Sequence, residues 1–210
     1  TLKVADGQEI TLHEQTNYPF EEKISFTVNT TEDVRFPFYL RIPSWCDQPE
    51  LAINGKQKEI DPIPGKYIYI DRTWTDGDKV ELNLPMKLSI HTWQVNKNSV
   101  SVNYGPLTLS LKINEEYIQK DSRSTAIYDS RWQEGADATQ WPSYEIFPKS
   151  PWNYALVLDS KVPLKNFKVI RKEWPSDNFP FTVSNVPLEV KAIGKQIPSW
   201  TLDKYGLCSE

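Results

Sequence analysis

Cysteine and histidine, the usual nucleophile, general base and zinc ligands of enzymes, are scarce in this sequence of 210 residues. It has two cysteines, Cys46 and Cys208, and two histidines, His13 and His91. No CxxC or HExxH spacing is present, so we expect no self-contained zinc site. No GxSxG nucleophile elbow is present, and both histidines are typical of plain strand residues rather than general bases. We therefore predict no catalytic, cofactor-binding or metal-binding residue, and two free, buried cysteines.

The 28 acidic residues guarantee that some carboxylates lie close together by accident. A glycosidase pair is defined by a spatial separation on the order of 5–10 Å, which a sequence does not show. Asp76 and Asp78 are the tightest acidic cluster, on either side of Gly77. No EF-hand pattern follows them, so we interpret them as turn-capping residues rather than metal ligands.

The eight tryptophans are the unusual feature of the composition. Indole rings stack on the flat C–H faces of sugars, but they also fill the cores and interfaces of β-sandwiches. Four of them adjoin strand patterns and favour the core or interface role: Trp45, Trp74, Trp152 and Trp200. Trp132 and Trp141 lie in an irregular stretch, where either a sugar platform or a domain-docking contact fits. They are the candidate sugar-contact residues.

These side chains must be positioned by β-strands, because the dominant hydrophobic period is two. In Lys23–Val28, Phe36–Ile42, Val80–Leu84 and Leu107–Leu111, apolar residues alternate with polar ones, as in antiparallel strands that cover a core on one side. Asn54-Gly55 predicts a type I′ hairpin turn. No stretch of twelve residues shows a 3.6 period, so we predict an all-β fold with little or no helix.

The strand rhythm divides the chain into two antiparallel β-sandwich-like modules. Strand patterns recur over residues 1–113, which we predict to be a first β-sandwich. Residues 114–142 are polar and predict an irregular connection with at most a short helical turn. After residue 142 the strand patterns resume, and the expected strands include residues 144–147, 154–158 and 179–183. Residues 143–210 are therefore predicted to form a second, smaller β module. A connection of that length favours a domain boundary.

Composition excludes several classes of protein. Apolar residues make up 39% and charged residues 25% of the chain, which is enough for a core and inconsistent with disorder. No apolar run reaches the roughly 18 residues of a membrane-spanning helix. The net charge of −4 gives no basic surface and argues against nucleic acid as a partner.

Several phrases, in order along the chain, resemble one known family. They are Tyr39–Trp45 (YLRIPSW), Ile53–Gly55 (ING), Gly65–Tyr67 (GKY), Arg72–Asp78 (RTWTDGD), Leu82–Met86 (LNLPM), Tyr104–Leu107 (YGPL), Ser150–Leu156 (SPWNYAL) and Ile197–Trp200 (IPSW). Together they are similar to the C-terminal β region of glycoside hydrolase family 127, the β-L-arabinofuranosidases once called domain of unknown function 1680.

The resemblance implies that the catalytic parts lie outside this chain. Family members have a catalytic (α/α)6 barrel ahead of two β-sandwich modules, and the barrel carries a zinc-bound cysteine nucleophile with glutamate and further cysteine ligands. Neither Cys46 nor Cys208 matches that set, so no catalytic residue carries over and the family's zinc is expected in the barrel. Both ends of the chain are expected to be cuts in a longer polypeptide. The resemblance further implies export to the periplasm or surface of a bacterium.

Three functions remain open from the sequence. The first is a non-catalytic accessory β region of a parent glycoside hydrolase, with the parent's own catalytic barrel as its partner. The second is an autonomous carbohydrate-binding module for plant-type glycans. The third is a bacterial surface or assembly module with no sugar role.

Overall fold

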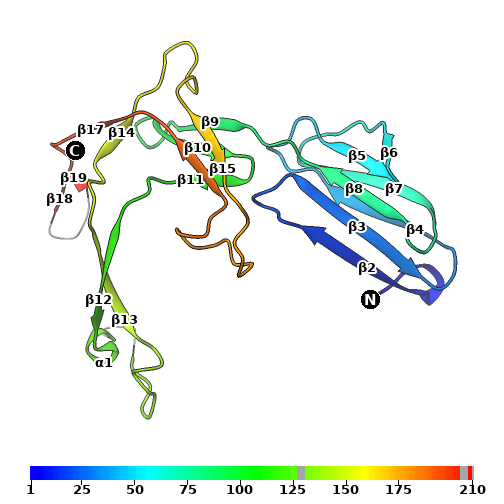
Figure 1. Cartoon of the computed structure of the whole chain (residues 1–210), viewed down its shortest axis with the longest axis horizontal. Helices are drawn as coiled ribbons and strands as arrows, with labels where there is room; N and C mark the ends of the chain where they lie inside the picture. Colours follow the sequence, from blue (N-terminus) through cyan, green and yellow to red (C-terminus); the bar gives the residue numbers. More distant parts are fainter. Residues whose placement is uncertain (127–130, 204–207, 210) are drawn as a thin grey trace. The chain divides into compact units, whose positions relative to one another are not determined.

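The computed structural model describes residues 1–126, 131–203 and 208–209, and in this part the regular secondary structure is almost entirely β-strand (Figure 1). The described helical segments are a 3₁₀ turn, η1 (Ala5–Gly7), and one helical turn, α1 (Ser122–Thr125). The predicted all-β fold is therefore confirmed. No helix in the described ranges has the length and apolarity that crossing a bilayer requires.

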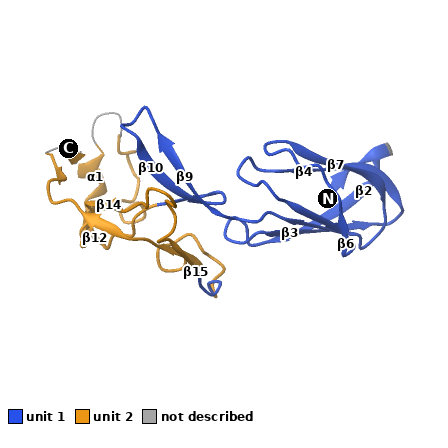
Figure 2. Cartoon of the chain, turned by 90° about the horizontal axis from the view of Figure 1, so that it is seen from above, with its two compact units in different colours: residues 1–109, 171–175 blue, residues 110–170, 176–210 orange. Residues whose placement is uncertain are grey.

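The chain divides into two compact units, which Figure 2 colours separately. Unit 1 comprises Thr1–Leu109 together with Arg171–Pro175, and unit 2 comprises Ser110–Ile170 and Ser176–Glu210. Arg171 and the four residues after it thus belong with the N-terminal half of the chain, although they follow it by some sixty positions.

Unit 1 contains two antiparallel sheets with a common core. The larger has the strand order β1-β2-β3-β8-β5-β6, and the smaller pairs β4 with β7. The bounds are β1 (Leu2–Lys3), β2 (Glu9–Thr16), β3 (Lys23–Thr30), β4 (Val34–Arg41), β5 (Glu50–Ile53), β6 (Lys56–Lys58), β7 (Tyr67–Trp74) and β8 (Lys79–Asn83). A further sheet of unit 1 pairs β10 (Ser99–Tyr104) with β9 (Leu88–Trp93) and β11 (Leu107–Leu109).

Trp74 is the largest fully buried side chain of the core between the two sheets. Its indole stacks on Phe36 at a centroid distance of 5.6 Å and meets Phe38 edge-on at 5.8 Å. Its Nε1–H donates to the Phe36 carbonyl oxygen at 2.9 Å, so the buried polar atom is satisfied. Apolar residues of β2, β3, β5 and β8 complete this core from the larger sheet, which is what the period-two pattern predicts.

Asn54 and Gly55 form the turn between β5 and β6. Their φ angles are +52° and +73°, so both central residues are left-handed, as a type I′ turn requires. Asn54 tolerates this conformation better than most residues and Gly55 adopts it without a steric penalty. The hairpin prediction from these two residues is confirmed.

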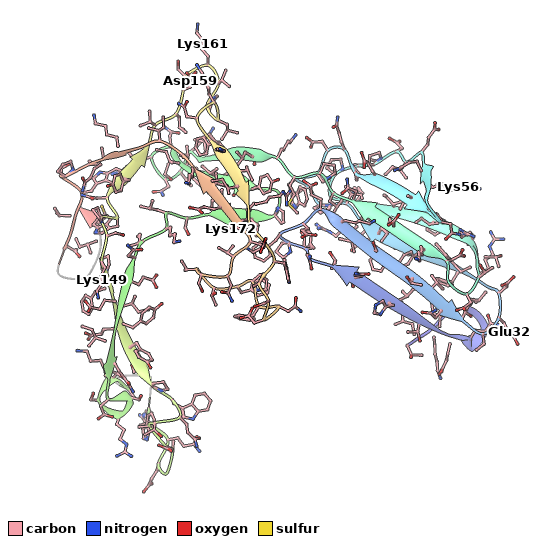
Figure 3. The ribbon with its side chains drawn as sticks, viewed as in Figure 1. Glu32, Lys56, Lys149, Asp159, Lys161 and Lys172 are labelled. Atoms are coloured by element: carbon pink, nitrogen blue, oxygen red, sulfur yellow. The ribbon has the colours of Figure 1, made fainter. Side chains whose placement is uncertain are left out.

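Two exposed residues of unit 1 are among those labelled in Figure 3. Lys56 starts the short edge strand β6, and Glu32 lies in the turn after β3.

Arg171 attaches its segment to the rest of unit 1. Its guanidinium donates to the Phe20 carbonyl oxygen at 3.1 Å and to the Tyr104 hydroxyl at 3.0 Å. It also lies over the Tyr104 ring, 5.8 Å from the centroid, and 3.5 Å from Glu22 Oε1. Glu22 in turn accepts from the Met86 backbone N–H at 2.9 Å. These contacts hold together residues far apart in sequence.

We expect Arg171→Met to lower the free energy of unfolding by about 1–2 kcal/mol, because it removes charge-assisted hydrogen bonds but keeps an apolar stem. Urea denaturation followed by circular dichroism measures the change. Lys56→Met on the exposed edge strand β6 is the control, and equal stability of the two variants would contradict the expected role of Arg171.

The described strands of unit 2 form short two-stranded pairs. One pair joins β12 (Glu115–Lys120) and β13 (Ser143–Pro148), and another joins β14 (Tyr154–Leu156) and β17 (Gly194–Gln196). The other two pairs are β15 (Lys168–Arg171) with β16 (Leu188–Lys191) and β18 (Thr201–Leu202) with β19 (Cys208–Ser209). The last residue of β15, Arg171, belongs to unit 1. Lys149, at the end of the β12–β13 hairpin, pairs with Glu116 at 3.1 Å (Figure 3). In the loop after β14, Asp159 accepts from the backbone N–H groups of Lys161 and Val162, both at 2.8 Å (Figure 3).

Two local expectations differ from the structure. Residues 115–120, which the sequence predicts to be irregular, form β12, because six residues pair with β13 although Tyr117 and Ile118 stay exposed. The strand expected over residues 179–183 is absent. Instead, the Asp177 carboxylate accepts from the Phe179 N–H at 3.0 Å, and Asn185 Nδ2 donates to the Phe179 carbonyl oxygen at 3.2 Å. These side chains occupy backbone groups that a strand would use.

Candidate functional site

The two tryptophans that the sequence singles out both lie in unit 2, between α1 and β13. Trp141 is 69% exposed, whereas Trp132 is half-buried. The carbonyl oxygen of Trp141 accepts from the buried Ser122 hydroxyl, which fixes its backbone next to α1. No ring contact between Trp132 and Trp141 occurs in the described residues, so these two rings do not form one stacked pair. Of the tryptophans expected in the core, Trp74 is fully buried and Trp45, Trp152 and Trp200 are half-buried.

A hollow of about 360 Å³ lies on the outer face of the six-stranded sheet, and we call it the β3 trough. The register explains it. Ser25 on the middle strand β3 lies between Gln15 on β2 and Glu81 on β8, and Thr27 lies beside Lys79. Short side chains on β3 between longer ones on its two neighbours leave a channel along that strand.

The β3 trough can bind a small uncharged polar molecule through hydrogen bonds. Apart from Phe26, its lining is made of hydroxyl, amide and charged side chains, and the Lys23 ammonium is paired with the Glu81 carboxylate. An ion pair at this exposed position contributes little stability and leaves no net charge. Within the described ranges, no three His, Cys, Asp or Glu side chains gather as metal ligands would. The trough therefore offers hydrogen-bonding groups to a polar molecule.

Asp76 and Asp78 cap turns, as the sequence indicates. Asp76 Oδ1 accepts from the Thr30 N–H at 3.1 Å and from Asn29 Nδ2 at 3.2 Å. Asp78 is only 5% exposed and accepts from the Thr75 N–H at 2.9 Å. The side chain of Asp78 also lies within a larger network that the sequence does not reveal.

That network joins Asp78 to Asn54 and Arg72. Asn54 Nδ2 donates to Asp78 Oδ1 at 2.6 Å, and the Arg72 guanidinium lies 3.3 Å from Asp78 Oδ2. Asn54 Oδ1 accepts from the Lys79 N–H at 2.8 Å, so the turn after β5 is tied to β8. Burial alone would raise the pKa of Asp78, but the bonds from Asn54 and Thr75 and the charge of Arg72 outweigh it and hold the pKa below its ordinary value.

The cysteines and histidines have ordinary surroundings. Cys46 is a free thiol and is fully buried, and burial raises its pKa. Cys208 is exposed, so the expectation that both cysteines are buried is wrong for this residue, which lies in the short strand β19. His91 packs edge-on against Trp93 at 4.4 Å, and His13 lies on the solvent-facing side of β2 opposite Thr27.

We expect the two cysteines to differ in their reactivity toward thiol reagents. In the folded protein a bulky aromatic disulfide reagent should modify Cys208 and leave Cys46 unmodified, because a buried thiol is inaccessible and its raised pKa lowers the thiolate fraction. In guanidinium chloride both should react. Cys208→Ser should abolish native labelling, and rapid labelling of that variant would show that Cys46 is accessible.

A row of tyrosines covers the outer face of the two-stranded sheet, and we call Tyr39, Tyr67 and Tyr69 the tyrosine strip. Tyr39 is directly opposite Tyr69 in the register, with ring centroids 5.1 Å apart. Tyr67 is the next outward residue of β7 and is opposite Arg41. The three side chains are 56%, 63% and 57% exposed in sequence order. Sequence reasoning did not single out this strip, although the alternation of Tyr67 and Tyr69 with two isoleucines could have indicated it.

A bidentate ion pair borders the tyrosine strip. Arg35 Nε and Nη2 donate to the two carboxylate oxygens of Asp71 at 3.2 and 2.9 Å. Hydrogen bonding to Arg35 lowers the pKa of Asp71, and the Tyr69 hydroxyl contributes in the same direction. Desolvation and the negative charge of Asp71 raise the pKa of Tyr69, so this hydroxyl stays protonated at neutral pH. Planar aromatic surface and fixed hydrogen-bonding groups thus lie side by side on one sheet face.

Comparison with known proteins gives a family match for the N-terminal part. Residues 1–86 match the family described as β-L-arabinofuranosidase, GH127 middle domain. No curated protein matches the chain.

Among solved structures, one called a glycoside hydrolase is 30% identical, with a TM-score of 0.44, and the alignment covers 47% of this chain and 17% of that one. A GH127 β-L-arabinofuranosidase from Geobacillus stearothermophilus is 23% identical, with a TM-score of 0.46 and coverages of 68% and 27%. A GH127 β-arabinofuranosidase is 21% identical, with a TM-score of 0.45 and coverages of 77% and 28%. The aligned part of the chain thus spans between 17% and 28% of these proteins.

The family match agrees with the resemblance found in the sequence. The family description names a middle domain, where the resemblance named the C-terminal β region as a whole. The tyrosine strip, the Asp78 network and the lining of the β3 trough all fall inside the matched residues. Residues 1–86 are thus similar to the GH127 middle domain of β-L-arabinofuranosidases.

Proposed function

We propose that the chain is a non-catalytic accessory β region of a GH127-type glycoside hydrolase. The observation that carries this proposal is the match of residues 1–86 to the middle domain of that family. Bond cleavage is then performed by a catalytic barrel elsewhere in the parent protein, and the zinc and cysteine nucleophile of the family belong to that barrel. The β region supports the barrel and shapes the approach to it.

The surroundings of the reactive side chains support this role. Asp76 and Asp78 bind backbone N–H groups of turns, and Cys46 is buried with a raised pKa. A nucleophilic cysteine needs the opposite conditions, namely an accessible position and a lowered pKa. These groups stabilise the sandwich and are poorly placed to attack a glycosidic bond.

The β12–β13 hairpin offers a surface for packing against the parent's catalytic domain. Exposed apolar side chains lie on both of its faces: Tyr117, Ile118, Tyr144, Ile146 and Phe147. An isolated two-stranded hairpin is marginally stable in water, and a protein surface rarely leaves such a cluster uncovered. Covering it would contribute about 25 cal/mol for each Å² of apolar area buried, before the entropic cost of association.

An activity assay tests the proposal. We expect the 210-residue chain to release no nitrophenolate from 4-nitrophenyl β-L-arabinofuranoside above the buffer rate, with or without zinc and a thiol reductant. Circular dichroism verifies that the chain is folded, and a GH127 arabinofuranosidase serves as the positive control. Sustained turnover by the chain, reduced by Cys46→Ser or Cys208→Ser, would overturn the non-catalytic role.

Carbohydrate binding is a second candidate function, and the exposed Trp141 is the observation that favours it. Its indole is available for stacking on a sugar ring, whereas the half-buried Trp132 presents less surface. Titration of the wild type and Trp141→Ala with soluble arabinan tests this role. It requires that the wild type binds and that the variant binds more weakly.

A further inference from the structure

We propose that the tyrosine strip on the β4–β7 sheet is a binding platform for an extended, uncharged glycan. The strip is a different surface from the Trp132–Trp141 region, since it belongs to unit 1 and those tryptophans belong to unit 2. The inference concerns a site on the middle domain itself, and only the choice of arabinan as probe rests on the proposed function.

The fold of the β4–β7 sheet keeps the Tyr39 and Tyr69 rings exposed to solvent. Tyr39 and Tyr69 face each other across the two strands, and the residues that alternate with them, Phe38 and Ile70, point to the core. Side chains of successive strand residues point to opposite faces, so the core packing holds the tyrosines outward. Cross-strand contact at 5.1 Å joins Tyr39 and Tyr69 into one continuous aromatic surface.

The charges beside the rings favour an uncharged ligand. Arg35 and Asp71 neutralise each other through two hydrogen bonds, and Arg41 is the remaining charge on the outward positions of the two strands. A polyanion would need several unpaired cations, and a cation would need unpaired carboxylates. A sugar instead needs ring surface for its C–H face and fixed polar groups for its hydroxyls. The strip and the Arg35–Asp71 pair provide both.

The dimensions of the sheet face favour a narrow chain over a protein partner. Each of the two strands has eight residues. At about 3.3 Å for each residue and about 4.8 Å between strands, their outward face is roughly 26 Å long and on the order of 10 Å wide. That is roughly 260 Å², whereas a standard protein interface buries about 800 Å² on each partner. A linear glycan lying along the strands matches this shape.

Binding to soluble arabinan, measured by isothermal titration calorimetry and affinity electrophoresis, tests the inference. We expect wild type to bind, and the double variant Tyr39→Thr/Tyr69→Thr to bind about tenfold or more weakly, because both stacking surfaces are lost. Threonine retains strand propensity, and the thermal midpoint checks that the variant is folded. Tyr39→Phe/Tyr69→Phe retains the rings and should bind within about threefold of wild type, half a tenfold step on the logarithmic scale of affinity.

Trp93→Ala is the matched control, since it removes a half-exposed aromatic ring from a different sheet of unit 1. Retained binding by Trp93→Ala together with loss in the tyrosine-to-threonine variant supports the strip as the site. Wild-type affinity in the tyrosine-to-threonine variant, or no binding by wild type, overturns the inference. Neither result affects the non-catalytic accessory role, which the nitrophenolate assay tests separately.

Discussion

Replacing Trp74 with alanine is expected to lower the free energy of unfolding by about 3–5 kcal/mol, the range for truncating a large buried aromatic residue. The side chain is fully buried, and it contacts Phe36 and Phe38 of the facing strand β4. Truncation leaves a cavity between the two sheets and an unpaired carbonyl at Phe36, which the indole N–H satisfies in the wild type. Urea denaturation followed by far-UV circular dichroism measures the loss.

Two variants separate the causes of this effect. Trp74→Phe keeps much of the ring volume but removes the N–H donor, so a loss of about 1–2 kcal/mol is expected even if the alanine variant does not fold. Trp93→Ala removes a tryptophan that is about half exposed and donates to the Ser101 hydroxyl at 3.2 Å. We expect it to change stability by less than about 1 kcal/mol. A loss in Trp74→Ala no larger than that in Trp93→Ala would show that Trp74 does not determine the core.

The sandwich of unit 1 follows from local sequence because its alternation is strong and one face of each strand is buried. Val80 and Leu82 on β8 are buried while Glu81 between them is only partly so, and this difference is visible in the sequence. The turn at Asn54-Gly55 is equally local, since it depends on which residues tolerate positive φ. Fold class and hairpin position therefore need no knowledge of distant partners.

Strands that are stabilised by backbone pairing and not by burial of one face cannot be predicted from alternation in the sequence. In β12 the adjacent Tyr117 and Ile118 are both exposed, so the sequence shows no alternation of apolar and polar residues that would predict the strand. Its pairing with β13 involves residues more than twenty positions away. Conversely, the apolar residues around Phe179 resemble a strand, but Asp177 and Asn185 bind its backbone groups. Which of these effects prevails depends on tertiary contacts.

The candidate sites show the same limit. The β3 trough exists because Ser25 and Thr27 lie between longer side chains of two other strands, and this requires the strand order β2-β3-β8. The tyrosine strip requires the register that places Tyr39 opposite Tyr69. Residue types along a single strand predict which face is polar, but register and strand order decide which side chains meet.

Substituting Asp78 with asparagine is expected to lower the free energy of unfolding by about 2–3 kcal/mol at pH 7, because a buried hydrogen-bonded charge is replaced by an amide. The carboxylate accepts from Asn54 Nδ2 and from the Thr75 N–H, and the Arg72 guanidinium is close to it. One end of the new amide carries N–H groups, so it faces donors that it cannot accept from. Asp76→Asn, in the same turn but exposed, keeps its acceptor oxygen and should stay within about 0.5 kcal/mol of wild type.

The effect of Asp78→Asn should depend on pH in a defined direction. The pKa of Asp78 is lower in the folded protein than its ordinary value of about 3.9. Stabilisation by the charged form is therefore fully present above that value and is lost as the pH falls through the folded-state pKa. Urea denaturation of both proteins between pH 7 and pH 2.5 should show a stability difference that is constant above about pH 5 and shrinks below about pH 4. A difference that remains unchanged down to pH 2.5 would mean that the charge of Asp78 does not stabilise the turn, and that the loss at pH 7 comes from altered packing instead.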